Sequence, residues 1–185
     1  MLVRESEHSF LPPLSGDVLD IGCHGFEFSH VAIKHGASRV IAVDLGPCGQ
    51  PPSGVTFTRA AIGADTRMVT YSTPAKRNAW HVGGGDAVIQ QLSVADLFAC
   101  FLIRNASLVK LDCERSELVI LDLLPDCVEQ ISVEFHLHVW PEDEPLVDAV
   151  MDRMAAKYDI VQHERTIRKA GEPANYWDTL MVRKC

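Results

Sequence analysis

Several features that define other protein classes are missing from this sequence of 185 residues. No apolar run approaches the roughly 20 residues of a membrane-spanning helix. Residues 1–13 carry charged side chains such as Arg4 and Glu7 where a secretory signal would have its apolar core. The six cysteines form no Cys-x-x-Cys pair, so zinc-ribbon and thioredoxin-type sites lack their signature. We therefore expect a cytoplasmic protein without a membrane partner.

Positive charge is also scarce, because 17 Lys and Arg oppose 25 Asp and Glu, for a formal net charge of −8. A protein that tracks nucleic-acid phosphates needs a basic face, so the acidity argues against nucleic acid as a partner. It favours a small neutral or cationic partner instead. The hydrophobic fraction of 47% is ordinary for a folded protein. The length fits one domain over residues 1–185, with residues 1–16 as an N-terminal extension.

The chain alternates short β-like runs with amphipathic runs, which predicts βαβ units and a largely parallel sheet. The expected strands are residues 17–21, 39–43, 55–58, 67–71, 107–111, 130–137, 160–167 and 176–182. The expected helices are residues 27–35, a helix from residue 94 after a capping box at Ser93 and Asp96, and residues 114–124 and 142–158. Residues 73–86, which contain three consecutive glycines, are expected to form a mobile loop.

A glycine turn and a carboxylate mark the ends of the first two expected strands. Gly22 and Gly25 follow the first strand, where glycine lets the backbone approach a ligand closely. Asp44 ends the next strand, and a carboxylate there can accept hydrogen bonds from both hydroxyls of a ribose. Together these features predict a cofactor that contains a nucleoside.

The charge of this turn favours one nucleoside cofactor over another. A dinucleotide needs the pattern G-x-G-x-x-G and a helix N-terminus free to hold a pyrophosphate. The chain lacks that pattern, and Glu27 at the helix start would repel a phosphate. S-adenosylmethionine has no phosphate and carries a sulfonium cation, which suits Asp20 and Glu27. A dinucleotide-dependent oxidoreductase remains the less favoured alternative.

The sequence resembles the FkbM-type S-adenosylmethionine-dependent methyltransferases over about residues 17–138. The most specific match is residues 108–117, LVKLDCERSE, against the family's L-I-K-I-D-V-E-G-A-E. The other matches, in the same order, are residues 18–24, 28–29, 39–44, 60–63 and 131–136. The resemblance implies a Rossmann-like methyltransferase fold of the α/β class. In that fold, a mostly parallel seven-stranded sheet carries helices on both faces and an antiparallel C-terminal strand.

Two positions depart from the family pattern, since Phe26 and Arg115 stand where the family has glycine. Arg115 is expected to alter the acceptor or to add a charged contact. Phe26 is expected to reshape the turn or to fill part of the pocket mouth. Phe26 therefore favours the alternative of a non-catalytic accessory protein with the methyltransferase fold that holds cofactor weakly or not at all.

The resemblance and the strand ends together give the candidate site. The cofactor-binding candidates are Asp20, Gly22, Cys23, His24, Gly25, Phe26, Phe28, Ser29, Asp44, Leu45, Ala61, Ile62 and Asp112. The catalytic candidates are His136, Asp112, Glu114 and Glu134. Asp112 and Glu114 could instead be helix caps.

Among the catalytic candidates, His136 is the first choice of base because histidine titrates nearest to neutral pH. Lys110 is expected to pair with a nearby acid. No metal is expected, although Glu134, His136 and His138 alternate along one strand. The predicted reaction is O-methylation of a small-molecule hydroxyl, such as a natural-product intermediate or a sugar, with N-methylation left open. The product would be S-adenosylhomocysteine, and the chain could act as a homodimer.

Overall fold

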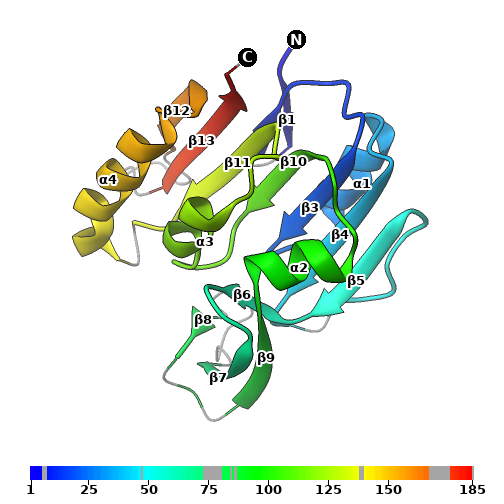
Figure 1. Ribbon diagram of the computed structural model, residues 1–185, viewed down its shortest axis with the longest axis vertical. Helices are drawn as coiled ribbons and strands as arrows, with labels where there is room; N and C mark the ends of the chain where they lie inside the picture. The colour runs from blue at the N-terminus through cyan, green and yellow to red at the C-terminus, as the bar shows by residue number, and fades with distance from the viewer. Residues whose placement is uncertain are drawn as a thin grey trace.

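The computed structural model describes residues 1–5, 8–46, 48–72, 81–83, 85, 87–137, 140–166 and 176–184. Its centre is a seven-stranded sheet in the order β12-β13-β11-β10-β3-β4-β5 (Figure 1). The strands are β3 (Asp17–Ile21), β4 (Arg39–Asp44), β5 (Val55–Arg59), β10 (Ala106–Leu111), β11 (Gln130–Phe135), β12 (Tyr158–Thr166) and β13 (Tyr176–Arg183). The five strands from β5 to β11 run parallel, and β13 runs antiparallel to both of its neighbours. This arrangement confirms the predicted fold class.

Helices cover both faces of this sheet. Neighbouring residues of β3, Val18 and Leu19, are both fully buried, and they belong to two separate apolar clusters. Val18 packs on the side of α1 (Glu27–Lys34), whereas Leu19 faces the cluster built with α2 (Val94–Cys100), α3 (Glu117–Leu123) and α4 (Glu144–Met154). Because successive side chains of a strand point to opposite faces of the sheet, a central parallel strand buries apolar side chains on both faces. No helix in the described ranges is long and apolar enough to cross a membrane.

Two expected helices begin later than predicted, for local reasons. The third helix starts at Glu117 and not at residue 114, because Glu114 and Arg115 have φ values of 51° and 83°, which an α-helix excludes. The fourth starts at Glu144, after the short 3₁₀ helix η1 (Pro141–Asp143). The capping box is confirmed, since the Ser93 hydroxyl accepts a hydrogen bond from the Asp96 amide at 2.9 Å.

A small second sheet lies beside the ends of the central strands (Figure 1), with the order β6-β9-β7-β8. Its strands are β6 (Ala61–Gly63), β7 (Arg67–Ser72), β8 (His81–Val82) and β9 (Ala87–Ser93). β8 falls within the segment expected to be a mobile loop, of which residues 73–80, 84 and 86 lie outside the described residues. β9 was not predicted. It buries the polar side chain of Gln91, whose amide donates to the Asp65 carbonyl at 2.9 Å.

The N-terminal extension forms a hairpin, β1 (Val3–Glu5) with β2 (His8–Phe10), that belongs to the core. Phe10 is fully buried, and the Ser9 amide donates to the Ser132 hydroxyl of β11 at 3.1 Å. Leu11 exchanges two backbone-to-side-chain hydrogen bonds with Gln130, at 2.8 and 2.9 Å. The hairpin therefore docks on β11 and carries His8 to the interior.

Candidate functional site

The turn after β3 is shaped by a close backbone approach. Gly22 has a φ of 79°, and a Cβ atom there would lie 1.7 Å from the carbonyl oxygen of Asp112. The Gly22 amide donates to the Val43 carbonyl at 2.8 Å. Since no side chain fits between these segments, glycine is required, and the ends of β3, β4 and β10 are drawn together.

A cavity of about 250 Å³ opens at these carboxyl ends, where parallel α/β sheets bind their ligands. It is lined by all four catalytic candidates and by the cofactor candidates Gly22, His24, Asp44, Leu45, Ala61, Ile62 and Asp112. The remaining lining residues, which sequence reasoning missed, are Ile21, Val43, Ala60, Val82, Cys113 and Ser116. Most of these adjoin a predicted residue in the chain, so widening each motif by one position would have found them.

The other cofactor candidates do not line this cavity. They are Asp20, Cys23, Gly25, Phe26, Phe28 and Ser29. Asp20 is fully buried and accepts a hydrogen bond from the Ser29 hydroxyl at 2.5 Å. This hydrogen bond links β3 to α1 beneath the turn. Asp20 and Ser29 are therefore placed to support the turn.

Phe26 does not fill the pocket mouth. Its φ of 70° is the left-handed conformation that a glycine would adopt, and its ring packs edge-on against Phe57 at a centroid distance of 5.6 Å. The side chain is 6% exposed and joins the apolar cluster beneath α1. The expectation of a partly filled mouth is therefore wrong, because the backbone turns the ring into the core.

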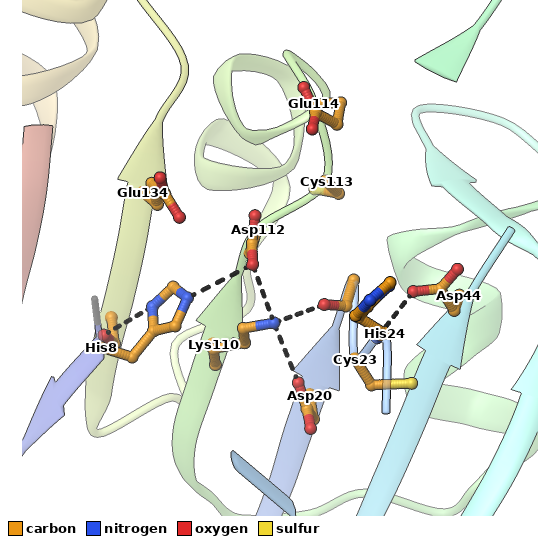
Figure 2. A network of polar contacts seen from close by, with 12 residues as sticks. His8, Asp20, Cys23, His24, Asp44, Lys110, Asp112, Cys113, Glu114 and Glu134 are labelled. Atoms are coloured by element: carbon orange, nitrogen blue, oxygen red, sulfur yellow. Dashed lines mark hydrogen bonds and ion pairs between the residues drawn. The ribbon is translucent and has the colours of Figure 1, made fainter. Parts of the chain in front are cut away.

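Asp44 presents its carboxylate at the end of β4 (Figure 2). One oxygen accepts a hydrogen bond from the His24 amide at 2.9 Å, and the other accepts one from the Gly46 amide at 2.6 Å. A carboxylate offers about four lone-pair sites. Two backbone amides therefore orient Asp44 and leave about two sites for a ligand in the cavity.

Lys110 of β10 does not line the cavity, and it links the residues that follow β3 and β10 (Figure 2). Its buried ammonium donates to the Gly22 carbonyl at 2.5 Å and lies 3.2 Å from Asp20 and 3.4 Å from Asp112. Burial lowers the pKa of Lys110, but the two carboxylates outweigh burial, so the pKa is raised. The expected pairing of Lys110 with an acid is confirmed.

His8 approaches the same network from the N-terminal hairpin, and sequence reasoning missed it. Its Nε2 lies 3.6 Å from Asp112, and its Nδ1 lies 3.3 Å from the Ser132 hydroxyl (Figure 2). The residue is 3% exposed. No local motif connects residue 8 with the strand ends, because the contact depends on how the hairpin docks.

His136 is surrounded by carboxylates. Its Nε2 lies 3.3 Å from Asp112 and 3.7 Å from Glu114, and its Nδ1 lies 3.6 Å from Glu117. Burial lowers the pKa of His136, but hydrogen bonds to Asp112 and Glu117 and nearby negative charges raise it well above 6.5. An imidazolium has no lone pair to accept a proton. This environment therefore favours His136 as a donor at neutral pH and not as the base.

Asp112 is the acidic partner of these cations. Burial raises its pKa, but Lys110, His136 and His8 outweigh burial and hold the pKa well below the ordinary 3.8. Asp112 thus stays ionised at neutral pH and is a weak proton acceptor. Of the four catalytic candidates, Glu114 and Glu134 are left to accept a proton.

A second cavity of about 500 Å³ adjoins the first and shares Ile62, Val82, Glu114 and Ser116 with it. Its other walls include the apolar residues Leu118, Val119, Trp140 and Leu146. Arg115 also lines it, with its guanidinium 2.6 Å from Asp143 and 5.9 Å from the Trp140 ring centre. Glu114 therefore stands at the junction of the two cavities.

No protein-family model matches this sequence, and no curated protein matches it. The likeness to the FkbM-type family is thus unconfirmed and rests on the motif residues alone. Solved structures do share the fold. TrmK from M. capricolum, in complex with the natural cofactor product S-adenosylhomocysteine, has a TM-score of 0.53 and 11% identity, over 94% of this chain and 64% of TrmK.

Two further structures match over most of both chains. SMU.1697c from Streptococcus mutans, also in complex with S-adenosylhomocysteine, has a TM-score of 0.52 and 8% identity, over 94% of this chain and 89% of its own. An S-adenosylmethionine-dependent methyltransferase from Mesorhizobium loti has a TM-score of 0.50 and 12% identity, over 94% of each chain. At these identities, the likeness establishes a Rossmann-like methyltransferase fold.

Proposed function

We propose that this chain is an S-adenosylmethionine-dependent methyltransferase that binds its cofactor in the 250 Å³ cavity. The observation that carries the proposal is the carboxylate of Asp44, oriented by two amides and facing a cavity floored by the left-handed Gly22 turn. The ribose hydroxyls of the cofactor would occupy the remaining lone pairs of Asp44. The structures of the same fold that hold S-adenosylhomocysteine support this choice of cofactor.

The charge of the cavity supports a cationic cofactor. Four carboxylates line it, from Asp44, Asp112, Glu114 and Glu134, and among the lining residues that the structure describes there is no Lys or Arg. Even with an imidazolium at His136, the lining stays negative. A sulfonium is attracted to such a site, whereas a pyrophosphate is repelled. The walls of Ala61 and Ile62 offer apolar surface to an adenine.

The acceptor would enter through the 500 Å³ cavity and meet the cofactor beside Glu114. The proposed acceptor is the hydroxyl of a small neutral or cationic molecule. Its oxygen attacks the methyl carbon, the carbon–sulfur bond breaks to leave S-adenosylhomocysteine, and Glu114 receives the hydroxyl proton. The mixed apolar and polar walls, which include Trp140 and Val119, are typical of a small-molecule site. The alternative of an accessory protein loses its support, since Phe26 packs away from the cavity.

Calorimetric titration with S-adenosylhomocysteine tests the cofactor site. Asp44→Ala should weaken binding by tenfold or more, because it removes hydrogen bonds to a charged group. Asp148→Ala, an exposed acid on α4, is the matched control and should leave affinity unchanged. Equal affinities for the wild type and Asp44→Ala would show that the ribose assignment is wrong.

A turnover assay tests the proposed acceptor chemistry. Formation of S-adenosylhomocysteine would be followed with a panel of hydroxylated and amine-bearing small molecules. Glu114→Gln should lower turnover of a hydroxyl acceptor by about 100-fold, the size of a general-base contribution. Affinity for S-adenosylhomocysteine, which has no sulfonium charge, should change far less. Turnover of amines alone, or full activity of Glu114→Gln, would contradict the hydroxyl proposal.

A further inference from the structure

We propose that Cys23, Asp44 and Cys48 form a binding site for a divalent ion of the zinc class. One ligand atom from each residue lies within 4.8 Å of the other two, and the two sulfur atoms are 3.5 Å apart. The three residues come from separate segments, namely the turn after β3, the end of β4 and the loop that follows. Two thiols and a carboxylate are ligands that Zn²⁺ accepts.

The sulfur spacing fits a chelate better than a disulfide. Zn–S bonds of about 2.3 Å in tetrahedral geometry place two sulfurs about 3.8 Å apart. A disulfide requires about 2.0 Å. The observed 3.5 Å is therefore within a few tenths of an ångström of a zinc chelate, whereas a disulfide would need much larger movement. Cys48 is only partly buried, which leaves room for water as the fourth ligand.

The local charge also favours a cation at this place. The negative charges of Asp20 and Asp44 act on Cys23, and those of Asp44 and Glu27 act on Cys48. Carboxylates gathered around the two sulfurs attract a divalent cation. On coordination, each thiol releases its proton to solvent and binds as the thiolate.

This ion would compete with the proposed cofactor for Asp44, and this consequence rests on the proposed function. Backbone amides already occupy about two of the four lone-pair sites of the carboxylate. The two ribose hydroxyls would take the rest. An ion on the Cys23 side needs one of those sites, so the cofactor would lose one hydrogen bond to a charged group. A bound metal ion would thus lower the affinity of the chain for the cofactor.

Titration of the fully reduced chain with Cd²⁺ tests the metal site without any cofactor. Binding should produce the ultraviolet charge-transfer absorption of cadmium thiolates at a ratio of one ion per chain. Cys48→Ser and Cys23→Ser should each lose most of this absorption, and Cys100→Ser, an exposed cysteine on α2, should keep it. An absent band in the wild type, or an unchanged band in Cys48→Ser, would overturn the proposal. Oxidation of the pair without metal uptake by the reduced chain would overturn it as well.

Calorimetry with S-adenosylhomocysteine tests the competition. Saturating Zn²⁺ should weaken binding to the wild type about tenfold, the effect of one lost charged hydrogen bond. Cys48→Ser should bind equally well with and without Zn²⁺, since Cys48 does not line the cavity. Unchanged affinity in the wild type would refute the competition. A chain that binds no S-adenosylhomocysteine even without metal would refute the proposed function, while the cadmium titration still decides the metal site.

Discussion

Two turns face each other at the floor of the cavity, one after β3 and one after β10, and both pass through left-handed backbone. In the first, Gly22 is required because a Cβ would strike the Asp112 carbonyl. In the second, Glu114 and Arg115 adopt φ values of 51° and 83° without any glycine, and Arg115 is held by Asp143. A left-handed non-glycine residue costs about 1 kcal/mol. Glycine is therefore indispensable where backbone meets backbone, whereas side-chain contacts can offset the cost of the same conformation elsewhere.

The largest effect is expected where one side chain joins the two turns. Lys110→Met would leave Asp20 buried without its cation and free the Gly22 carbonyl. We expect a loss of about 3–5 kcal/mol in the free energy of unfolding, measured by urea denaturation. Lys157→Met, which breaks an exposed pair with Asp126, is the control and should cost less than about 1 kcal/mol. Similar losses in both variants would mean that Lys110 does not hold the turns together.

Two glycines separate the steric cost of an added Cβ from the conformational cost of a positive φ. Gly22 and Gly83 both have positive φ values, of 79° and 99°, but nothing lies within 4 Å of a Cβ built on Gly83. Gly83→Ala should therefore cost about 1 kcal/mol from conformation alone. Gly22→Ala should cost about 3 kcal/mol or more, because backbone atoms must also move. Equal destabilisation in urea unfolding would remove the steric argument.

The turn after β10 should respond to pH through His136. Its folded pKa is raised above the ordinary 6.5, so its contribution to stability is complete below about pH 6.5 and is lost as the pH rises through the folded value. His136→Gln should cost about 2 kcal/mol near pH 6, since it removes hydrogen bonds to charged groups. Unfolding free energies measured from pH 6 upward should show this difference shrinking. A constant difference across that range would mean that His136 is not protonated in the folded chain.

The smallest effect concerns Arg115 itself. Arg115→Ala would lose the pair with Asp143 and keep the left-handed strain, for a loss of about 1–2 kcal/mol. Arg115→Gly would lose the same pair but relieve the strain, so it should be about 1 kcal/mol more stable than Arg115→Ala in thermal or urea unfolding. If the alanine variant is the more stable, the strain assigned to this turn is wrong.

Elements dominated by local pattern could be predicted from the sequence. The strand at residues 17–21 has the predicted bounds, and the Ser93 cap and the parallel sheet are as expected. The predictions fail where contacts between distant parts of the chain determine the backbone conformation. Glu114 and Arg115 are not helical, although their residue types permit a helix. β9 forms with a buried Gln91 because the Asp65 carbonyl accepts a hydrogen bond from the Gln91 amide. The positions of His8 and of the Cys23–Cys48 pair depend on segments that no short motif connects.

The strands of the central sheet, the helices and the acids near the strand ends could be predicted from local patterns, because alternation and turn chemistry are local properties. What each acid does depends on tertiary contacts. Asp20 lies one residue before the end of β3 and Asp44 ends β4. The sheet register sets Asp20 beside Lys110, where it is buried and neutralised. Asp44 ends its strand next to the cavity, oriented by two amides. The role of a carboxylate follows from the neighbours that packing brings to it, and those neighbours lie far away in the chain.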